Sequence, residues 1–199
     1  MGTPFVYDPG DGFLSGEALQ SPPPFAHARS AVVHDGLARN LVTRLKYGDR
    51  TELASFMADW MVNAGNDILA DCDLIVPVPL HFRRFLTRHY NQAAELSRYI
   101  AKKTGKDFRP DVLKRHRYTR QQVGLRATER HKNVKGAFTV PKAGKTAIKG
   151  KNIILVDDVF TTGATVRAAT TALCKAGAHK VSVLTFSRVL TETADTCFT

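Results

Sequence analysis

The chain has 199 residues, a length that suits one domain or one domain with a small appendage. Its composition, 43% hydrophobic and 24% charged, is that of a globular protein. No run approaches the roughly 18 apolar residues of a membrane span. The formal net charge of +11 points to anionic partners, namely nucleic acid, phosphorylated metabolites or an acidic membrane surface.

The three cysteines, Cys72, Cys174 and Cys197, are scattered along the chain and form no CxxC pair. This usage is typical of a reducing compartment, and we expect no zinc in this chain. The N-terminus lacks the basic region and apolar core of a signal peptide. These features predict a cytoplasmic protein without membrane insertion.

The positive charge is concentrated in residues 81–135. This segment holds 16 Lys/Arg and 4 Asp/Glu, whereas the rest of the chain holds 13 Lys/Arg and 14 Asp/Glu. A solvated basic face is the simpler interpretation of such a segment. Because the whole excess of charge lies in about a quarter of the chain, we favour an anion-binding surface.

Hydrophobic periodicity predicts a domain of residues 31–199 after an irregular N-terminal arm of residues 1–30 that is rich in Gly, Pro and Asp. The expected strands are 31–34, 73–79, 151–156 and 180–186, and the expected helices are 36–47, 51–64, 91–104 and 165–175. Residues 106–135 are polar and basic and predict a mobile loop with short helical pieces. Apolar strands that alternate with helices are typical of an α/β fold with a parallel sheet covered on both faces.

The most informative segment begins as an apolar strand at Ile154, continues through two adjacent carboxylates, and leads through a Thr/Gly loop into a helix. Ligands of parallel α/β sheets bind outside the carboxyl ends of the strands, and a helix N-terminus offers free N–H groups to a phosphate. Asp157 and Asp158 suit the hydroxyl groups of a ligand or a nearby metal. The predicted phosphate loop consists of Thr161, Thr162, Gly163, Ala164 and Thr165. Together these groups match a sugar phosphate, whereas an acid pair that only capped the helix would be costly to bury.

Gly144-Lys145-Thr146 is similar to the end of a nucleotide-binding P-loop. That pattern requires a glycine where the chain has Thr139, and a helix directly after the motif, where Lys149 and Gly150 follow instead. We therefore expect a surface turn at this position rather than a nucleotide site.

The segment around Asp157 resembles the phosphoribosyl pyrophosphate (PRPP) signature of type I phosphoribosyltransferases. From about residue 30 to Val189, the chain resembles the ComF family of phosphoribosyltransferase-like proteins. The further motifs that carry this resemblance are Val76-Pro77-Val78-Pro79-Leu80, Arg83, Arg84, Arg88, Asn91-Gln92-Ala93, Thr119, Gln122, Leu125, Arg130 and Asn133-Val134-Lys135-Gly136-Ala137-Phe138.

The resemblance implies a type I phosphoribosyltransferase fold, which is a twisted and mainly parallel sheet with helices on both faces and a small N-terminal hood or arm. In that case residues 1–30 would be a remnant of the zinc module with which ComF proteins often begin. Asp157 and Asp158 would bind the ribose hydroxyls of PRPP, and residues 161–165 its 5-phosphate. The pyrophosphate loop would contain Leu80, His81, Arg83, Arg84 and Arg88, and a flexible closing loop would contribute Arg115, Arg120, Gln122 and Arg130.

By the same resemblance, the protein would be a Mg²⁺-dependent phosphoribosyltransferase. Mg²⁺ would be held mainly through PRPP, with Asp157 and Asp158 acting through water, and neither the acceptor nor a general base is identified. The alternative is a non-catalytic nucleic-acid-binding accessory factor of natural transformation, because ComF proteins are linked to DNA uptake. Its partners would be single-stranded DNA and proteins of the competence machinery, and a homodimer is compatible with both hypotheses.

Overall fold

The computed structural model describes residues 22–47, 52–80, 90–116 and 136–190. Within these ranges five strands form one sheet in the order β1-β7-β6-β2-β3, and every neighbouring pair is parallel. These strands are β1 (Ala28–Val33), β2 (Leu74–Pro77), β3 (Asp107–Phe108), β6 (Asn152–Phe160) and β7 (Lys180–Arg188). The short strands β4 (Lys114–Arg115) and β5 (Phe138–Thr139) form a separate antiparallel pair. The carboxyl ends of all five parallel strands therefore lie at one edge of the sheet.

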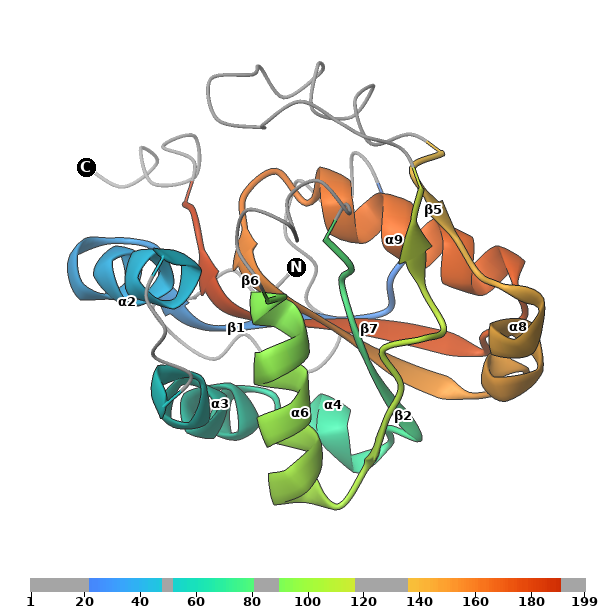
Figure 1. Cartoon of the computed structure of the whole chain (residues 1–199), viewed down its shortest axis with the longest axis horizontal. Coiled ribbons are helices and arrows are strands. Elements are labelled where there is room, and N and C mark those ends of the chain that lie inside the picture. The colour runs from blue at the N-terminus through green and yellow to red at the C-terminus, as the bar shows by residue number, and fades with distance from the viewer. Residues whose placement is uncertain (1–21, 48–51, 81–89, 117–135, 191–199) are drawn as a thin grey trace, which may run out of the picture.

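Helices cover both faces of the sheet, with α8 and α9 on one side and α3, α4 and α6 on the other (Figure 1). The helices are α2 (Gly36–Tyr47), α3 (Glu52–Ala64), α4 (Asn66–Ala70), α6 (Gln92–Thr104), α8 (Lys142–Ile148) and α9 (Ala164–Lys175). Alternate residues of β6 join two different core clusters: Leu155 packs with Leu173 of α9, and Val156 with Leu45 of α2 and Met61 of α3. This confirms the predicted α/β fold. No helix within the described ranges is long and apolar enough to cross a membrane.

The predicted helix after Asn91 shows how local sequence sets an element's bounds. The Asn91 side chain accepts a hydrogen bond from the Ala93 N–H at 3.1 Å and caps the start of α6. Gly105 ends the helix in the left-handed conformation, with φ of 68°. The bounds of α6 thus agree with the predicted helix of residues 91–104 to within one residue.

Several elements differ from the sequence-based expectation, which has no counterpart of α4, β3 or β5 and makes β2 three residues longer. β6 continues four residues beyond Val156 and includes the acid pair, because its pairing with β7 extends to Phe160. β1 begins at Ala28 rather than at residue 31, because Ala28 already pairs with Val183. The predicted turn at residues 144–146 is wrong, since these residues lie inside α8, where Gly144 is buried against the backbone of Val112.

Two predicted segments are only partly described. Of the N-terminal arm, residues from 22 onward are described, and Phe25 is buried with its ring 6.3 Å from that of Phe160. Of the predicted mobile loop, residues 106–116 contain β3 and β4, and residues 117–135 lie outside the described residues. Cys72 and Cys174 are free thiols.

Candidate functional site

The acid pair lies at the carboxyl edge of the sheet, where β6 leads toward α9 (Figure 1). Asp157 pairs in register with Thr185 of β7, and the N–H of Asp158 donates to Oδ1 of Asp157 at 2.9 Å. Both carboxyl groups are largely buried, and only 15% of the Asp158 side chain is exposed. The two predicted ribose-binding residues therefore lie at the expected edge of the sheet.

The two carboxyl groups interact strongly. Burial, followed by the neighbouring charge of Asp158, raises the pKa of Asp157 to about 8, whereas the positive charges of Lys46 and Arg115 oppose this rise. Asp157 therefore keeps its proton to a higher pH than an ordinary aspartate, which lowers the negative charge of the pair. Carboxyl groups with such a perturbed pKa cluster at functional sites.

Lys46 is a member of the site that the sequence analysis does not identify. It lies near the end of α2, and its Nζ forms an ion pair with Oδ2 of Asp158 at 2.9 Å. Both side chains are mostly buried, with 24% of Lys46 exposed. The periodicity of α2 indicates only its core-facing side, and Arg44 offers a second basic residue in the same turn, so the sequence carries no signal that selects Lys46.

His34 also lies beside the acid pair, although the sequence favours a surface or loop histidine at this position. It follows β1 directly; its backbone N–H donates to the Arg188 carbonyl at 2.7 Å, and its Nδ1 lies 2.8 Å from Oγ of Ser187. Burial and the charge of Lys46 lower the pKa of His34, and the charge of Asp158 opposes this shift. The imidazole is therefore mostly neutral at neutral pH.

The predicted phosphate loop connects β6 to α9. Gly163 has a φ of 70°, and a Cβ atom at this position would lie 2.8 Å from Cζ of Phe160. No side chain caps α9, whose first-turn N–H groups suit an anion. The hydroxyl of Thr162 is buried and has no hydrogen-bond partner in the described part of the chain. Of the other loop residues, Thr161 and Thr165 are half-buried and Ala164 is buried.

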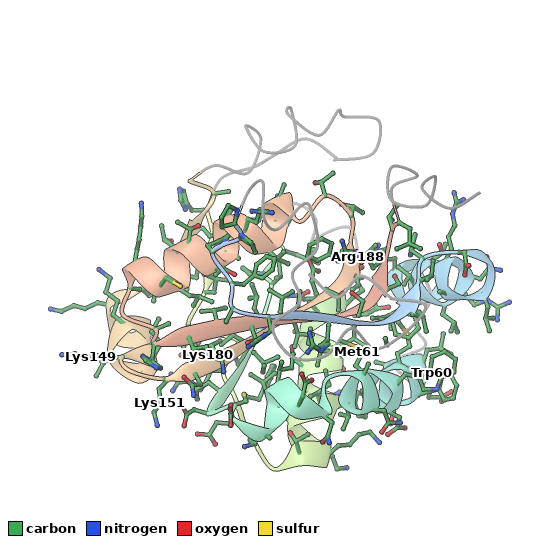
Figure 2. All side chains as sticks on the ribbon, turned by 180° about the vertical axis from the view of Figure 1, so that it is seen from behind. Trp60, Met61, Lys149, Lys151, Lys180 and Arg188 are labelled. Carbon is green, nitrogen blue, oxygen red and sulfur yellow. The ribbon has the colours of Figure 1, made fainter. Side chains whose placement is uncertain are left out.

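An aromatic ring supports this loop. Phe160 is buried; the Arg188 guanidinium carbon lies 4.9 Å from the centre of its ring, and Phe25 contacts the ring edge-on. In Figure 2, Arg188 lies away from Lys149, Lys151 and Lys180, which gather at the other end of the sheet. Gly163 therefore packs on a ring that is held from two sides.

The segment after β2 lies at the same edge as the acid pair. The Val78 N–H donates to the Val156 carbonyl at 2.8 Å, and the Asn91 side-chain amide donates to the Val78 carbonyl at 3.1 Å. Leu80 follows, half-buried. Gln92 at the start of α6 is 2% exposed, and its Nε2 has no hydrogen-bond partner among the described residues. The sequence analysis uses Gln92 only as part of a family motif.

The other predicted residues divide between described and undescribed segments. Arg115 lies in β4, with its guanidinium carbon 5.4 Å from the centre of the Phe138 ring, and its charge acts on Asp157. Its positive charge therefore acts on the acid pair from β4. Seven predicted residues lie outside the described residues: His81, Arg83, Arg84, Arg88, Arg120, Gln122 and Arg130.

The site supplies oxygen atoms of the kind that Mg²⁺ prefers, in two carboxylates and an unpartnered hydroxyl. Across the described ranges, no three or more His, Cys, Asp or Glu side chains come together in a way that could hold a metal ion. Asp158 is moreover paired with Lys46. These residues thus fit a Mg²⁺ ion held mainly by ligand oxygens and water, and they do not form a complete protein cage.

A family model described as phosphoribosyl transferase domain matches residues 93–196. The DNA utilization protein YhgH of Salmonella typhi is 32% identical over 180 residues, which is 88% of this chain and 78% of that protein. Its counterpart in Escherichia coli strain K12 is 31% identical over the same shares. Competence protein F of Haemophilus influenzae is 34% identical over 116 residues, which is 58% of this chain and 50% of that protein.

Two solved structures show a partial likeness in fold. One is described as the allosteric regulatory enzyme of purine biosynthesis, with a TM-score of 0.45 and 20% identity over 72% of this chain and 29% of that chain. The other is the glutamine PRPP amidotransferase from B. subtilis complexed with ADP and GMP, with a TM-score of 0.44 and 20% identity over 71% and 30%. This chain thus matches less than a third of either one.

Proposed function

Because the chain belongs to the ComF family of proteins that carry a phosphoribosyltransferase domain, we propose that its site binds PRPP with Mg²⁺ and transfers the phosphoribosyl group to an acceptor. In this proposal Asp157 and Asp158 bind the ribose hydroxyls, and residues 161–165 bind the 5-phosphate. The predicted cytoplasmic location is part of the same proposal, since PRPP is a metabolite of that compartment.

The proposal rests on two neighbouring features, the acid pair and the loop that follows it. A buried acid pair at a strand end lies next to a loop with a left-handed glycine, an uncapped helix N-terminus and the unpartnered Thr162 hydroxyl. Buried polar groups without partners are rare in folded proteins, and a ligand is one explanation for such a group. A sugar phosphate would satisfy both halves of this site, because its hydroxyls suit the carboxylates and its phosphate suits the loop.

The reaction displaces pyrophosphate from C1 of ribose through a state in which positive charge develops on the sugar. In this proposal, Asp157 and Asp158 hold the ribose by two of its hydroxyls and thereby fix the position of C1. The loop around Gly163 holds the 5-phosphate at the other end of the sugar. When bound, Mg²⁺ supplies positive charge that offsets the charge developing on the departing pyrophosphate.

The test is calorimetric titration of the full chain with PRPP, with and without Mg²⁺. We expect saturable binding by the wild type and loss of binding in the Asp157→Asn/Asp158→Asn variant, because each lost charge-assisted hydrogen bond removes about 1.5–3 kcal/mol. Asp73→Asn is the matched control, since Asp73 precedes β2 and accepts a hydrogen bond from the N–H of Asn152 at the opposite end of β6. Equal PRPP affinity in the double variant and the wild type would contradict the assignment of the acid pair to ribose.

A second candidate function is a nucleic-acid accessory role without catalysis. Two observations favour it: residues 81–135 carry the whole excess of positive charge, and the relatives are named for DNA utilization and competence. Direct binding of single-stranded DNA would weaken with salt by about 0.7 log units per phosphate contact. Replacement of Arg115, Arg117 and Arg120 by Ala would then flatten this slope by roughly two units. Absence of DNA binding at about 50 mM salt would exclude direct binding.

A further inference from the structure

The end of α2 holds Lys46 in a defined place. The neighbouring residue Leu45 is fully buried in the core, and its carbonyl oxygen accepts a hydrogen bond from the Tyr90 hydroxyl. The burial of Leu45 and this hydrogen bond thus hold the backbone next to Lys46 in place. The Nζ of Lys46 lies 2.9 Å from Oδ2 of Asp158. With 24% of the Lys46 side chain exposed, this is a mostly buried ion pair and differs from the exposed pairs elsewhere in the structure.

A mostly buried ion pair is not explained well by stability. Desolvation of two charges offsets much of their attraction, and well-packed apolar residues often stabilise a fold equally well. Lys46 moreover pairs with Asp158, one of the two residues assigned to the ligand. The lysine thus lies where it affects the site directly.

The charge balance of the site points to the same role. An isolated acid pair would repel a phosphorylated ligand, which is itself an anion. Two described cations act on Asp157: Lys46 from α2 and Arg115 from β4. His34 is a further basic group beside the acid pair. Burial and the charge of Lys46 lower its pKa, so it adds little positive charge at neutral pH. Lys46 is therefore a major local source of positive charge for the acid pair.

Lys46 is also connected to the segment after β2. Tyr90, which donates to the Leu45 carbonyl, directly precedes Asn91, and the Asn91 amide donates to the Val78 carbonyl. The loop predicted to hold pyrophosphate begins two residues after Val78, at Leu80. The end of α2 is thus attached both to the acid pair and to the base of that loop.

We propose that Lys46 is a positioning residue of this site, which holds the Asp158 carboxylate in place for the sugar hydroxyls and offsets the charge of the acid pair toward an anionic ligand. This inference rests on the proposed binding of PRPP and adds to it a residue from a helix outside the matched family region. In this role Lys46 acts through its positive charge.

The experiment is titration of the full-length protein with PRPP and Mg²⁺ at about 50 mM and about 500 mM salt. Lys46→Met removes the charge, Lys46→Arg retains it, and Arg44→Met is the matched control. Arg44 is exposed in the same helix turn and makes no ion pair with a described residue. Lys46→Gln keeps a hydrogen-bond donor for Asp158 without the charge, and it replaces Lys46→Met if that variant does not fold.

We expect Lys46→Met or Lys46→Gln to weaken PRPP binding about tenfold or more at low salt and less at high salt. Lys46→Arg should stay within about threefold of the wild type, and Arg44→Met should be unchanged. An affinity of Lys46→Met or Lys46→Gln that equals or exceeds that of the wild type would overturn the role of Lys46 while leaving the proposed function intact. Absence of PRPP binding in the wild type itself would overturn both.

Discussion

Aspartates lie beside both ends of β6, and their carboxyl groups are in opposite states. At the amino end, Asp73 is exposed and accepts a hydrogen bond from the Asn152 N–H at 2.8 Å, and this bond lowers its pKa. At the carboxyl end, Asp157 is buried beside Asp158, and its pKa is raised to about 8. The strand thus begins beside Asp73, which is stabilised in its charged form, and carries near its other end Asp157, which is destabilised in that form.

Each end also has a buried polar atom without a partner among the described residues. At the amino end this atom is Oδ1 of Asn152, a residue that lines a cavity of about 10 Å³, which is about the size of one water. At the carboxyl end, the unpartnered Thr162 hydroxyl lies in a loop suited to an anion. The amino end of β6 thus stabilises the fold, whereas the carboxyl end lowers the stability of the fold and provides groups for a ligand.

The largest effect is expected from a pair of glycines with the same backbone conformation, one at each end of β6. Gly150 and Gly163 both have a φ of 70°, but an added Cβ has open space at Gly150 and lies 2.8 Å from Phe160 at Gly163. Gly150→Ala should lower the free energy of unfolding by about 1 kcal/mol, and Gly163→Ala by about 2–4 kcal/mol. Urea denaturation measures both, and equal losses would contradict the close packing of the loop on Phe160.

The next effect concerns Asp157 and is a gain in stability. A carboxyl group whose pKa is raised by folding stabilises the fold at low pH, and this contribution is lost as the pH rises from about 4 to about 8. Asp157→Asn should therefore raise the free energy of unfolding by about 1–3 kcal/mol at pH 8, with little difference at pH 4. Denaturation across this pH range tests the prediction, and a gain that does not depend on pH would contradict the raised pKa.

A smaller effect separates a ligand-facing hydroxyl from a structural one. Thr162 and Thr170 both have a buried hydroxyl without a partner in the described ranges, but Thr170 lies in the middle of α9. Either Thr→Val change should raise the free energy of unfolding by about 1 kcal/mol, because an unsatisfied hydroxyl is removed. Only Thr162→Val should weaken PRPP binding in calorimetry. Equal PRPP affinity in the two variants would contradict a role of the Thr162 hydroxyl in binding the phosphate.

The smallest effect is expected at the amino end. The lowered pKa of Asp73 means that this carboxylate stabilises the fold above its ordinary pKa, and that the contribution is lost as the pH falls through the lowered value. Asp73→Asn should therefore lower the melting temperature slightly at neutral pH and leave PRPP binding unchanged. A loss of PRPP affinity in this variant would mean that the two ends of β6 are coupled.

The sequence predicts those parts of the site whose residues are close together in the chain. The segment from Ile154 to Thr165 contains the acid pair, the loop and the helix start, so strand and helix patterns are enough to place them at one edge. Lys46 and His34 reach the same edge from separate elements more than 110 residues away, and only the pairing of β1 with β7 and the packing of α2 bring them there. No local pattern encodes that packing.

The extent of β6 shows a different limit of sequence patterns. Adjacent aspartates are unfavourable in strands, so the pattern predicts a strand that ends at Val156. Register with β7 carries the strand to Phe160 nevertheless, because Asp157 faces Thr185 and Phe160 faces Arg188. The burial that raises the pKa of Asp157 follows from this extension, which is why the sequence predicts the presence of the acids but not their protonation.

The order of the strands also bears on when the site forms during synthesis. Among the described strands β1 pairs only with β7, and the hydroxyls of Ser30 and Thr185, which lie 2.7 Å apart, are separated by 155 residues. At a translation rate of about 5–20 residues per second, β7 is synthesised about 8–30 s after β1. Lys46 and Asp158 are separated by 112 residues, so their ion pair can likewise form only after β6 has been synthesised.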